Sequence, residues 1–271
     1  MSDLVLLERD GPVATLVLND PERRNAMSHA MGERFRERVA ELCSDESVRA
    51  VILTGAGRAF SGGGDLSMIG SRAAEAASGS EGAEEARRAI RDIMRGFYGL
   101  FLSIRDVPCP TIAAVGGHAV GAGLCLALAC DLRIVAREAR LALNFTRLGL
   151  HPGMGATWTL PRLVPAEVAA ELLYTGRTIR GEEAPALGLA RRALPAEEVL
   201  PAARALAAEI AAAAPRAVRG VKRALRRTEG ASLEDQLLFE ATEQAACFGT
   251  ADVREGLRAA VEKRDPRFTG A

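Results

Sequence analysis

The fold of this chain is decided by one stretch of its sequence, TIAAVGGHAVGAGLCLALAC, at residues 111–130. Residues 111–115 are apolar, which predicts a buried strand, and residues 121–129 predict a buried helix. Glycines fill the turn between them. A glycine at a strand-to-helix turn lets the backbone approach a ligand closely and aims N–H groups at negative charge. This turn is therefore the first candidate for a binding site.

A second stretch repeats this order. AVILT at residues 50–54 predicts a strand that is buried on both faces, and GRAFSGGGDL at residues 57–66 follows it within an expected loop at residues 55–64. Neither turn contains the G-x-G-x-x-G of a dinucleotide site or the Gly-Lys-Ser/Thr of a phosphate loop. For either turn alone, glycines that serve only tight packing remain an equally good explanation.

Composition excludes several classes of protein. The chain has 271 residues, of which 48% are apolar, so it can bury a sizeable core. Its 35 basic and 35 acidic residues balance, which argues against binding of nucleic acid. Residues 111–130 lack charges but are broken by glycines, and residues 1–10 lack the pattern of a signal peptide, so we expect no membrane association.

The five cysteines are scattered, without a C-x-x-C pair or a nearby histidine pattern. A zinc site or a disulfide framework is therefore not expected, and we predict no metal. Reduced, mostly buried thiols are typical of a cytoplasmic protein. We accordingly expect a cytoplasmic location.

Strands and helices alternate through the first two-thirds of the chain, which indicates an α/β architecture. Strands are expected at residues 4–7, 13–18, 50–54, 111–115 and 132–136, and helices at 28–43, 84–105 and 121–129. From residue 161 onward we expect helices almost exclusively, at 165–174, 197–213, 216–227, 232–247 and 250–263. A shift in composition near residue 195 predicts an α/β core at 1–195 and a separate helical region at 196–271 that serves oligomerisation.

Six motifs follow one another along the chain. They are NDPxxxNAM (19–27), AFSGGGDL (59–66), AAVGGxAxGAG (113–123), LGLxPG (148–153), LxxTGR (172–177) and REGLRAAVEKR (254–264). Together they resemble the crotonase, or enoyl-CoA hydratase/isomerase, superfamily. GATW at 155–158, LPR at 160–162 and PRFTG at 266–270 look most like its phenylacetate-pathway enoyl-CoA isomerase branch. The resemblance implies an α/β spiral of ββα units with a C-terminal helical layer, a homotrimer or hexamer, and an acyl-CoA substrate whose coenzyme A is part of the substrate and not a separate cofactor.

The resemblance also implies which residues form the site. The backbone N–H groups of Gly64 and Ala122 would hold the thioester oxygen as an oxyanion hole, which suits an enolate. Asp65, Leu66 and Ser67 would run along coenzyme A, although Asp65 fits a helix N-cap equally well. Arg23, Arg24 and Arg58 could meet its phosphates, and Lys263 matches a position from which a neighbouring subunit reaches the nucleotide.

The chain departs from the family pattern at the acid positions. The two glutamates that hydratases use correspond to Cys125 and Phe145, and an aspartate of some isomerase and dehalogenase branches corresponds to Gly153. Ordinary two-glutamate hydration is therefore disfavoured. His151 is the candidate acid/base group, because histidine exchanges protons near neutral pH, although an exposed loop histidine is the more frequent case. Cys125 and His118 are more simply explained by packing.

Three hypotheses follow. An acyl-CoA enzyme with isomerase-type proton transfer leads, because a double-bond shift needs only one proton-transferring group. An acyl-CoA-binding homologue without turnover is the alternative. An RNA-binding or scaffolding protein of the same fold comes last, because the charge balance argues against it.

Overall fold

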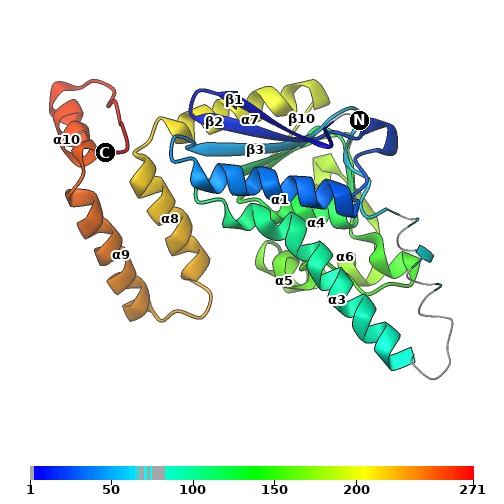
Figure 1. Ribbon diagram of the computed structural model, residues 1–271. Coiled ribbons are helices and arrows are strands. Elements are labelled where there is room, and N and C mark those ends of the chain that lie inside the picture. The colour runs from blue at the N-terminus through cyan, green and yellow to red at the C-terminus, as the bar shows by residue number, and fades with distance from the viewer. Residues whose placement is uncertain (1–2, 66, 68–69, 72–73, 75–82) are drawn as a thin grey trace.

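The computed structural model describes residues 3–65, 67, 70–71, 74 and 83–271. Its main sheet has six strands in the order β1-β2-β3-β5-β7-β10 (Figure 1). These strands are β1 (Val5–Asp10), β2 (Val13–Leu18), β3 (Ala50–Gly55), β5 (Thr111–Val115), β7 (Leu132–Ala136) and β10 (Arg192–Leu194). Within this sheet β1 and β2 pair antiparallel, and each later neighbouring pair is parallel.

A second sheet of short strands has the order β4-β6-β8-β9. Its members are β4 (Ala59–Ser61), β6 (His118–Val120), β8 (Arg140–Ala142) and β9 (Thr178–Arg180). The chain passes from β3 to β4, from β5 to β6 and from β7 to β8, so each pass adds one strand to each sheet. This is the predicted crotonase spiral, which is thereby confirmed.

Two sequence-based expectations about strands are wrong. The segment 55–64, expected to be a loop, contains β4, and the region after residue 161, expected to be almost wholly helical, contains β9 and β10. Three-residue strands bury too few side chains to leave an alternating pattern in the sequence. They form here because neighbouring passes of the spiral offer them a partner.

Helices connect and cover the sheets. They are α1 (His29–Ser44), α3 (Ala83–Leu102), α4 (Ala122–Ala129), α5 (Ala156–Thr159), α6 (Ala166–Thr175) and α7 (Ala196–Ala211). Ser28 caps α1 by accepting a hydrogen bond from the Met31 N–H at 3.2 Å. Phe101 of α3 packs between Phe35 of α1 and Phe97, with ring centroids 5.6 and 5.3 Å apart. The contact between the Phe35 and Phe101 rings packs α1 against α3 in the core.

The helix α4 is buried at every one of its eight residues. Its lack of charge therefore reflects a position inside the protein core. Among the described residues, no helix combines the length and the apolar character needed to cross a membrane.

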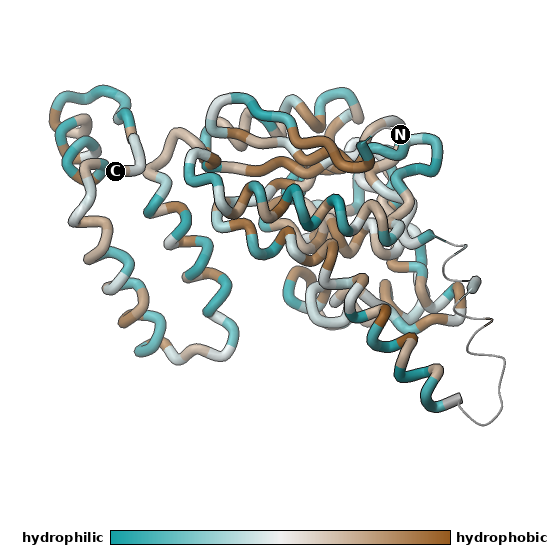
Figure 2. Tube along the Cα trace, viewed as in Figure 1, coloured by the Kyte–Doolittle hydropathy of each residue, from teal (hydrophilic) through white to brown (hydrophobic). Residues whose placement is uncertain are grey.

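The C-terminal region has two parts. Although it follows residue 195, α7 lies against β3, β5 and β7 of the main sheet. The helices α8 (Pro215–Arg227), α9 (Leu233–Phe248) and α10 (Ala251–Glu262) instead project from the core as an arm (Figure 1). Apolar and polar segments alternate along these arm helices (Figure 2). That the region 196–271 serves oligomerisation stays a prediction.

Candidate functional site

The two glycine turns lie side by side because their strands are neighbours. β4 pairs in parallel with β6, with Ala59 opposite His118 and Ser61 opposite Ala119. A Cβ built on Gly63 would lie 2.5 Å from the Val120 carbonyl oxygen and 3.6 Å from the Ala122 nitrogen. Gly63 also has a φ of +93°, which side-chain-bearing residues rarely adopt. Position 63 therefore requires glycine if the turns are to touch.

The N–H groups on either side of Gly64 in the first turn are occupied. Gly62 donates to the Arg24 carbonyl at 2.8 Å, and Gly63 donates to the Ser61 hydroxyl at 3.1 Å. Met27 forms a parallel bridge with Gly64 by donating to Gly63 and accepting from Asp65, which turns the Gly64 N–H to the opposite side. Within the described part of the chain, the Gly64 N–H makes no hydrogen bond.

The second turn leads directly into α4. Gly121, with a φ of +53°, is the N-cap, and Ala122 is the first helical residue. The N–H of a first residue has no carbonyl partner within its own helix, and the helix dipole favours negative charge there. A Cβ on Gly123 would lie 2.6 Å from the Ser61 carbonyl oxygen, so α4 presses closely on β4. The two turns thus present donors suited to a negatively charged oxygen.

Asn25 holds the first turn in place, a role that the sequence analysis did not assign. Its side-chain amide donates to the carbonyls of Ala56 and Ala59 at 2.9 and 2.8 Å, and its carbonyl oxygen accepts from the Asp20 N–H at 2.9 Å. Asn25 is fully buried and has a φ of +53°. The signal was its place in the NDPxxxNAM motif, but the carbonyls that its amide binds are brought to it only by the tertiary fold.

Asp65 and Ser67, two of the residues expected along coenzyme A, belong to the end of the first turn and the residues that follow it. One carboxylate oxygen of Asp65 accepts from the Ser67 N–H at 2.9 Å and from its hydroxyl at 2.6 Å, as a helix cap would. Asp65 also pairs with Arg23. Leu66 lies outside the described residues. The cap explanation of Asp65 is supported, and a contact with a ligand is compatible with it.

The basic candidates are spread over the molecule. Arg24 is exposed, and its backbone adjoins the first turn through the Gly62 hydrogen bond. Arg58 is exposed just before β4. Lys263 is exposed at the end of α10, which lies in the arm, away from α4 of the core (Figure 1). Within one chain, Lys263 therefore does not join the other candidates.

Comparisons with known proteins show which family the chain belongs to. The family model described as enoyl-CoA hydratase/isomerase matches residues 8–271. The chain belongs to the enoyl-CoA hydratase/isomerase family.

A Thermus thermophilus protein provisionally named an enoyl-CoA hydratase is 42% identical, with 95% of this chain and 98% of that protein covered. The short-chain-enoyl-CoA hydratase of Clostridium acetobutylicum is 32% identical, with 96% and 95% covered. The crystal structure of an enoyl-CoA hydratase from Bacillus anthracis matches with a TM-score of 0.86 and 35% identity, over 99% of this chain and 100% of that one. The crotonase assignment is confirmed, and the nearness to the phenylacetate-pathway branch stays a prediction.

In this member of the enoyl-CoA hydratase/isomerase family, the three positions that lack acids lie around the second turn. The Cys125 Sγ lies 3.7 Å from the Gly153 carbonyl oxygen. The Phe145 ring, in the short 3₁₀ helix Asn144–Leu148, comes to 4.0 Å of a Cβ built on Gly121. Burial raises the pKa of the Cys125 thiol to about 12, so it stays protonated and behaves as core. None of these three residues supplies a carboxylate.

The two histidine candidates differ in their surroundings. The Nδ1 of His118 accepts a hydrogen bond from the Arg140 N–H at 3.0 Å, which ties β6 to β8 and supports the packing explanation. His151 is exposed, and its Nδ1 lies 2.8 Å from the Pro152 carbonyl oxygen. Among the described residues, no group of three or more His, Cys, Asp or Glu could hold a metal ion.

Proposed function

We propose that this family member binds an acyl-CoA thioester and polarises its carbonyl oxygen with the backbone N–H groups of Gly64 and Ala122. The observation that carries the proposal is that these donors lie in adjoining turns and have no partner of their own among the described residues. When a proton leaves the α-carbon, negative charge moves to the thioester oxygen. Donors fixed in advance at that oxygen stabilise the charge without reorganisation.

The reaction that suits the site is an isomerase-type proton transfer. Adding water across a double bond needs an acid and a base, and positions 125, 145 and 153 offer neither. A double-bond shift needs one group that moves a proton. His151 is our candidate, because an Nδ1–H that donates to Pro152 leaves Nε2 as the free acceptor.

Coenzyme A would enter as part of the substrate, and no separate cofactor is required. Asp65, Leu66 and Ser67 would line its path from the first turn, and Arg24 would meet a phosphate. Lys263 would contribute from a neighbouring subunit, since its own arm carries it away from the turns. We also assign the protein to the cytoplasm, where its five cysteines would stay reduced.

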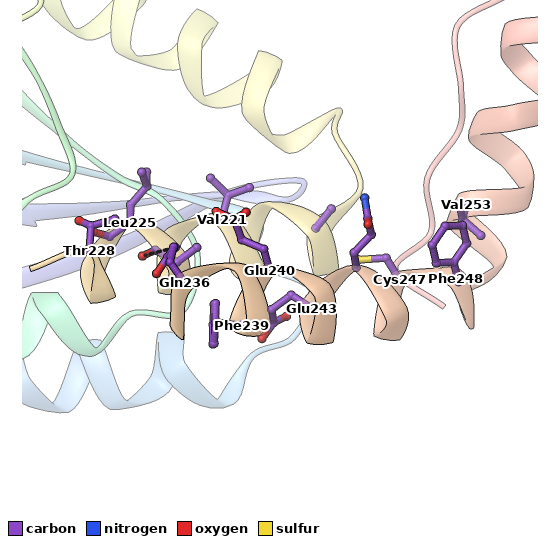
Figure 3. Close-up of a pocket in the computed structure, with 14 residues that line it drawn as sticks. Val221, Leu225, Thr228, Gln236, Phe239, Glu240, Glu243, Cys247, Phe248 and Val253 are labelled. Atoms are coloured by element: carbon purple, nitrogen blue, oxygen red, sulfur yellow. Dashed lines mark hydrogen bonds between the residues drawn. The ribbon is translucent and has the colours of Figure 1, made fainter. Parts of the chain in front are cut away.

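The arm is the surface through which we expect copies to assemble into a homotrimer or a hexamer. Between α8 and α9 runs a groove of about 600 Å³, lined by apolar side chains that include Val221, Leu225 and Phe239 (Figure 3). Leu233, Leu237 and Leu238 of α9 are also exposed. An apolar surface of this kind on a single chain indicates an interface with another chain.

A catalytically silent acyl-CoA-binding homologue is the alternative function. Phe145 beside Gly121 and the fully buried Cys125 favour it, because they leave the vicinity of Ala122 without a proton-transferring carboxylate. The two functions differ in whether hydrogen leaves the α-carbon.

The test combines binding and turnover on a panel of enoyl-, dienoyl- and 3-hydroxyacyl-CoAs in D₂O. Mass spectrometry follows deuterium entering the acyl group, and calorimetry follows binding. Ala122→Pro removes one N–H at a first helical position, which tolerates proline, whereas Ala122→Gly retains it as the matched control. We expect Ala122→Pro to lower the exchange rate about 100- to 1000-fold and Ala122→Gly to leave it near the wild-type rate.

The outcomes separate the hypotheses. Binding without exchange, unaffected by His151→Ala, would establish the silent homologue. Absence of binding to every CoA ester would exclude both functions. Full exchange in Ala122→Pro would exclude this N–H as a donor.

A further inference from the structure

The hydroxyl of Tyr98 lies where a side chain at position 153 would begin. Tyr98 belongs to α3, far in sequence from the loop that contains Gly153. A Cβ built on Gly153 would lie 2.4 Å from the Tyr98 hydroxyl oxygen and 2.8 Å from its ring carbon Cζ. Real Cβ contacts are not so short, so the phenol occupies the space above Gly153.

This position adjoins the second glycine turn. Cys125 lies one helical turn after Ala122 in α4, and its Sγ is 3.7 Å from the Gly153 carbonyl oxygen. Gly153 therefore lies against the first turn of α4, and the Tyr98 hydroxyl lies beside Gly153. The Tyr98 ring is half-buried and meets Phe97 edge-on, with ring centroids 6.5 Å apart.

The surroundings of Tyr98 favour a neutral proton donor. In the part of the chain that the structure describes, its hydroxyl makes no hydrogen bond. Burial, and then the nearby Cys125, raise the pKa of the phenol above its usual value. At neutral pH the group therefore keeps its proton and can donate it, whereas it is a poor base.

We propose that Tyr98 is a catalytic residue that donates a proton to the substrate carbon during the double-bond shift. This role rests on the proposed function. A base, His151 in the proposed function, removes a proton from the α-carbon. The electron pair of that C–H bond forms a C=C bond, and the π pair of the carbonyl moves onto the thioester oxygen. When the pair returns, a new C–H bond forms at the other end of the allylic system as the O–H bond of Tyr98 breaks. The phenolate then takes a proton from water and the protonated base returns its proton to water, so protons and electrons balance.

The test replaces each of the two tyrosines of the chain by phenylalanine. Tyr98→Phe removes only the hydroxyl, and Tyr174→Phe, at a side chain that is 79% exposed, is the matched control. On the enoyl-CoA that the wild-type chain turns over fastest, we expect Tyr98→Phe to lower kcat about 100-fold or more, with KM unchanged. Tyr174→Phe should keep the wild-type kcat.

A second measurement distinguishes catalysis from a structural role. With tyrosine labelled by ¹³C at Cζ, the Tyr174→Phe chain shows a single tyrosine signal, that of Tyr98. Acetoacetyl-CoA, whose enolate resembles the charged intermediate, should shift this signal and should bind Tyr98→Phe and wild type equally well.

Three results would overturn the role. Wild-type kcat in Tyr98→Phe would show that the hydroxyl is dispensable. Loss of acetoacetyl-CoA binding together with kcat would show that Tyr98 only shapes the pocket. A wild-type chain that binds no CoA ester and exchanges no hydrogen would overturn the proposed function and this role with it.

Discussion

The spiral core and the C-terminal arm differ in how far they bury their apolar side chains. β5 and α4 of the core are buried at every residue, whereas α9 of the arm has no buried residue at all. The core thus buries its apolar side chains within one chain. The arm exposes leucines and is joined to the core chiefly by polar contacts of α8. Buried apolar packing is concentrated in one region and exposed apolar surface in the other, and a partner for the arm stays a prediction.

The largest effect on stability is expected in the core. Phe101 is fully buried between Phe35 and Phe97, so Phe101→Ala leaves a cavity that the surrounding helices cannot fill. We expect a loss of about 3–5 kcal/mol in the free energy of unfolding, measured by denaturant titration. Phe101→Leu is the control and should lose less, because it retains more of the volume. A loss below about 1 kcal/mol for the alanine variant would contradict a tightly packed core.

A somewhat smaller effect is expected at the joint between the regions. The buried Lys222 ammonium of α8 donates to the Cys109 carbonyl and to Asp131, both at 2.6 Å. Lys222→Met removes one of the charged partners of the Asp131 carboxylate. We therefore expect a loss of about 3 kcal/mol in the free energy of unfolding, measured by denaturant titration, and faster hydrogen exchange in α8. Lys263→Met, at an exposed lysine, should change stability by less than about 0.5 kcal/mol. Equal effects of both variants would mean that Lys222 does not anchor the arm.

Acid should weaken the same joint. Burial acts to raise the pKa of Asp131, but the Lys222 charge and hydrogen bonds from Lys222 and Thr111 outweigh it, so the net pKa is lowered. A lowered carboxyl pKa stabilises the fold above the unfolded value of about 3.9, and that stability is lost as the pH falls below it. The free energy of unfolding should therefore fall less steeply from pH 5 to pH 3 in Asp131→Asn than in wild type. Parallel slopes would show that this carboxylate contributes nothing.

The smallest effect on the single chain is expected within the arm. Leu237 and Leu238 are exposed, so Leu237→Glu/Leu238→Glu should change the intrinsic stability by less than about 0.5 kcal/mol. The same change should convert an oligomer to a monomer, as measured by light scattering, because two charges would enter an apolar interface. Arg36→Glu on the exposed face of α1 is the control and should leave the mass unchanged. A monomeric wild type would mean that the arm needs no partner.

Sequence alone predicted the parts of the fold whose signal is local. Residues 111–115 and 132–136 are strands with the predicted bounds. The first is buried at every residue and the second is apolar apart from Arg133, so both stand out in the sequence as short apolar runs. Ser28, Ser232 and Thr250 cap α1, α9 and α10 within a residue of the predicted starts. The second sheet was missed because β4, β6, β8 and β9 have three residues each and pair only after the spiral has closed.

The candidate site likewise contains residues that the sequence suggested and residues that only the structure brings to it. Gly64 and Ala122 were assigned through the resemblance to the crotonase superfamily; the structure places their two turns side by side, and their role as oxyanion donors stays a prediction. Tyr98 was missed because it reaches Gly153 from a helix distant in sequence, and its neighbour Phe97 makes it look like one more core residue of α3. Asn25 was quoted only as a motif letter, since the carbonyls that it binds come from residues 56 and 59. Contacts between distant segments are what a single sequence conceals.

The N–H groups at positions 64 and 122 belong to the peptide backbone, so they are encoded by no particular codon. Every amino acid except proline supplies the same donor, and here glycine and alanine do so. The neighbouring side chains, among them Cys125 and Phe145, can therefore change without removing these N–H groups. A lineage built on such donors can acquire new chemistry by changing its acids and bases one at a time.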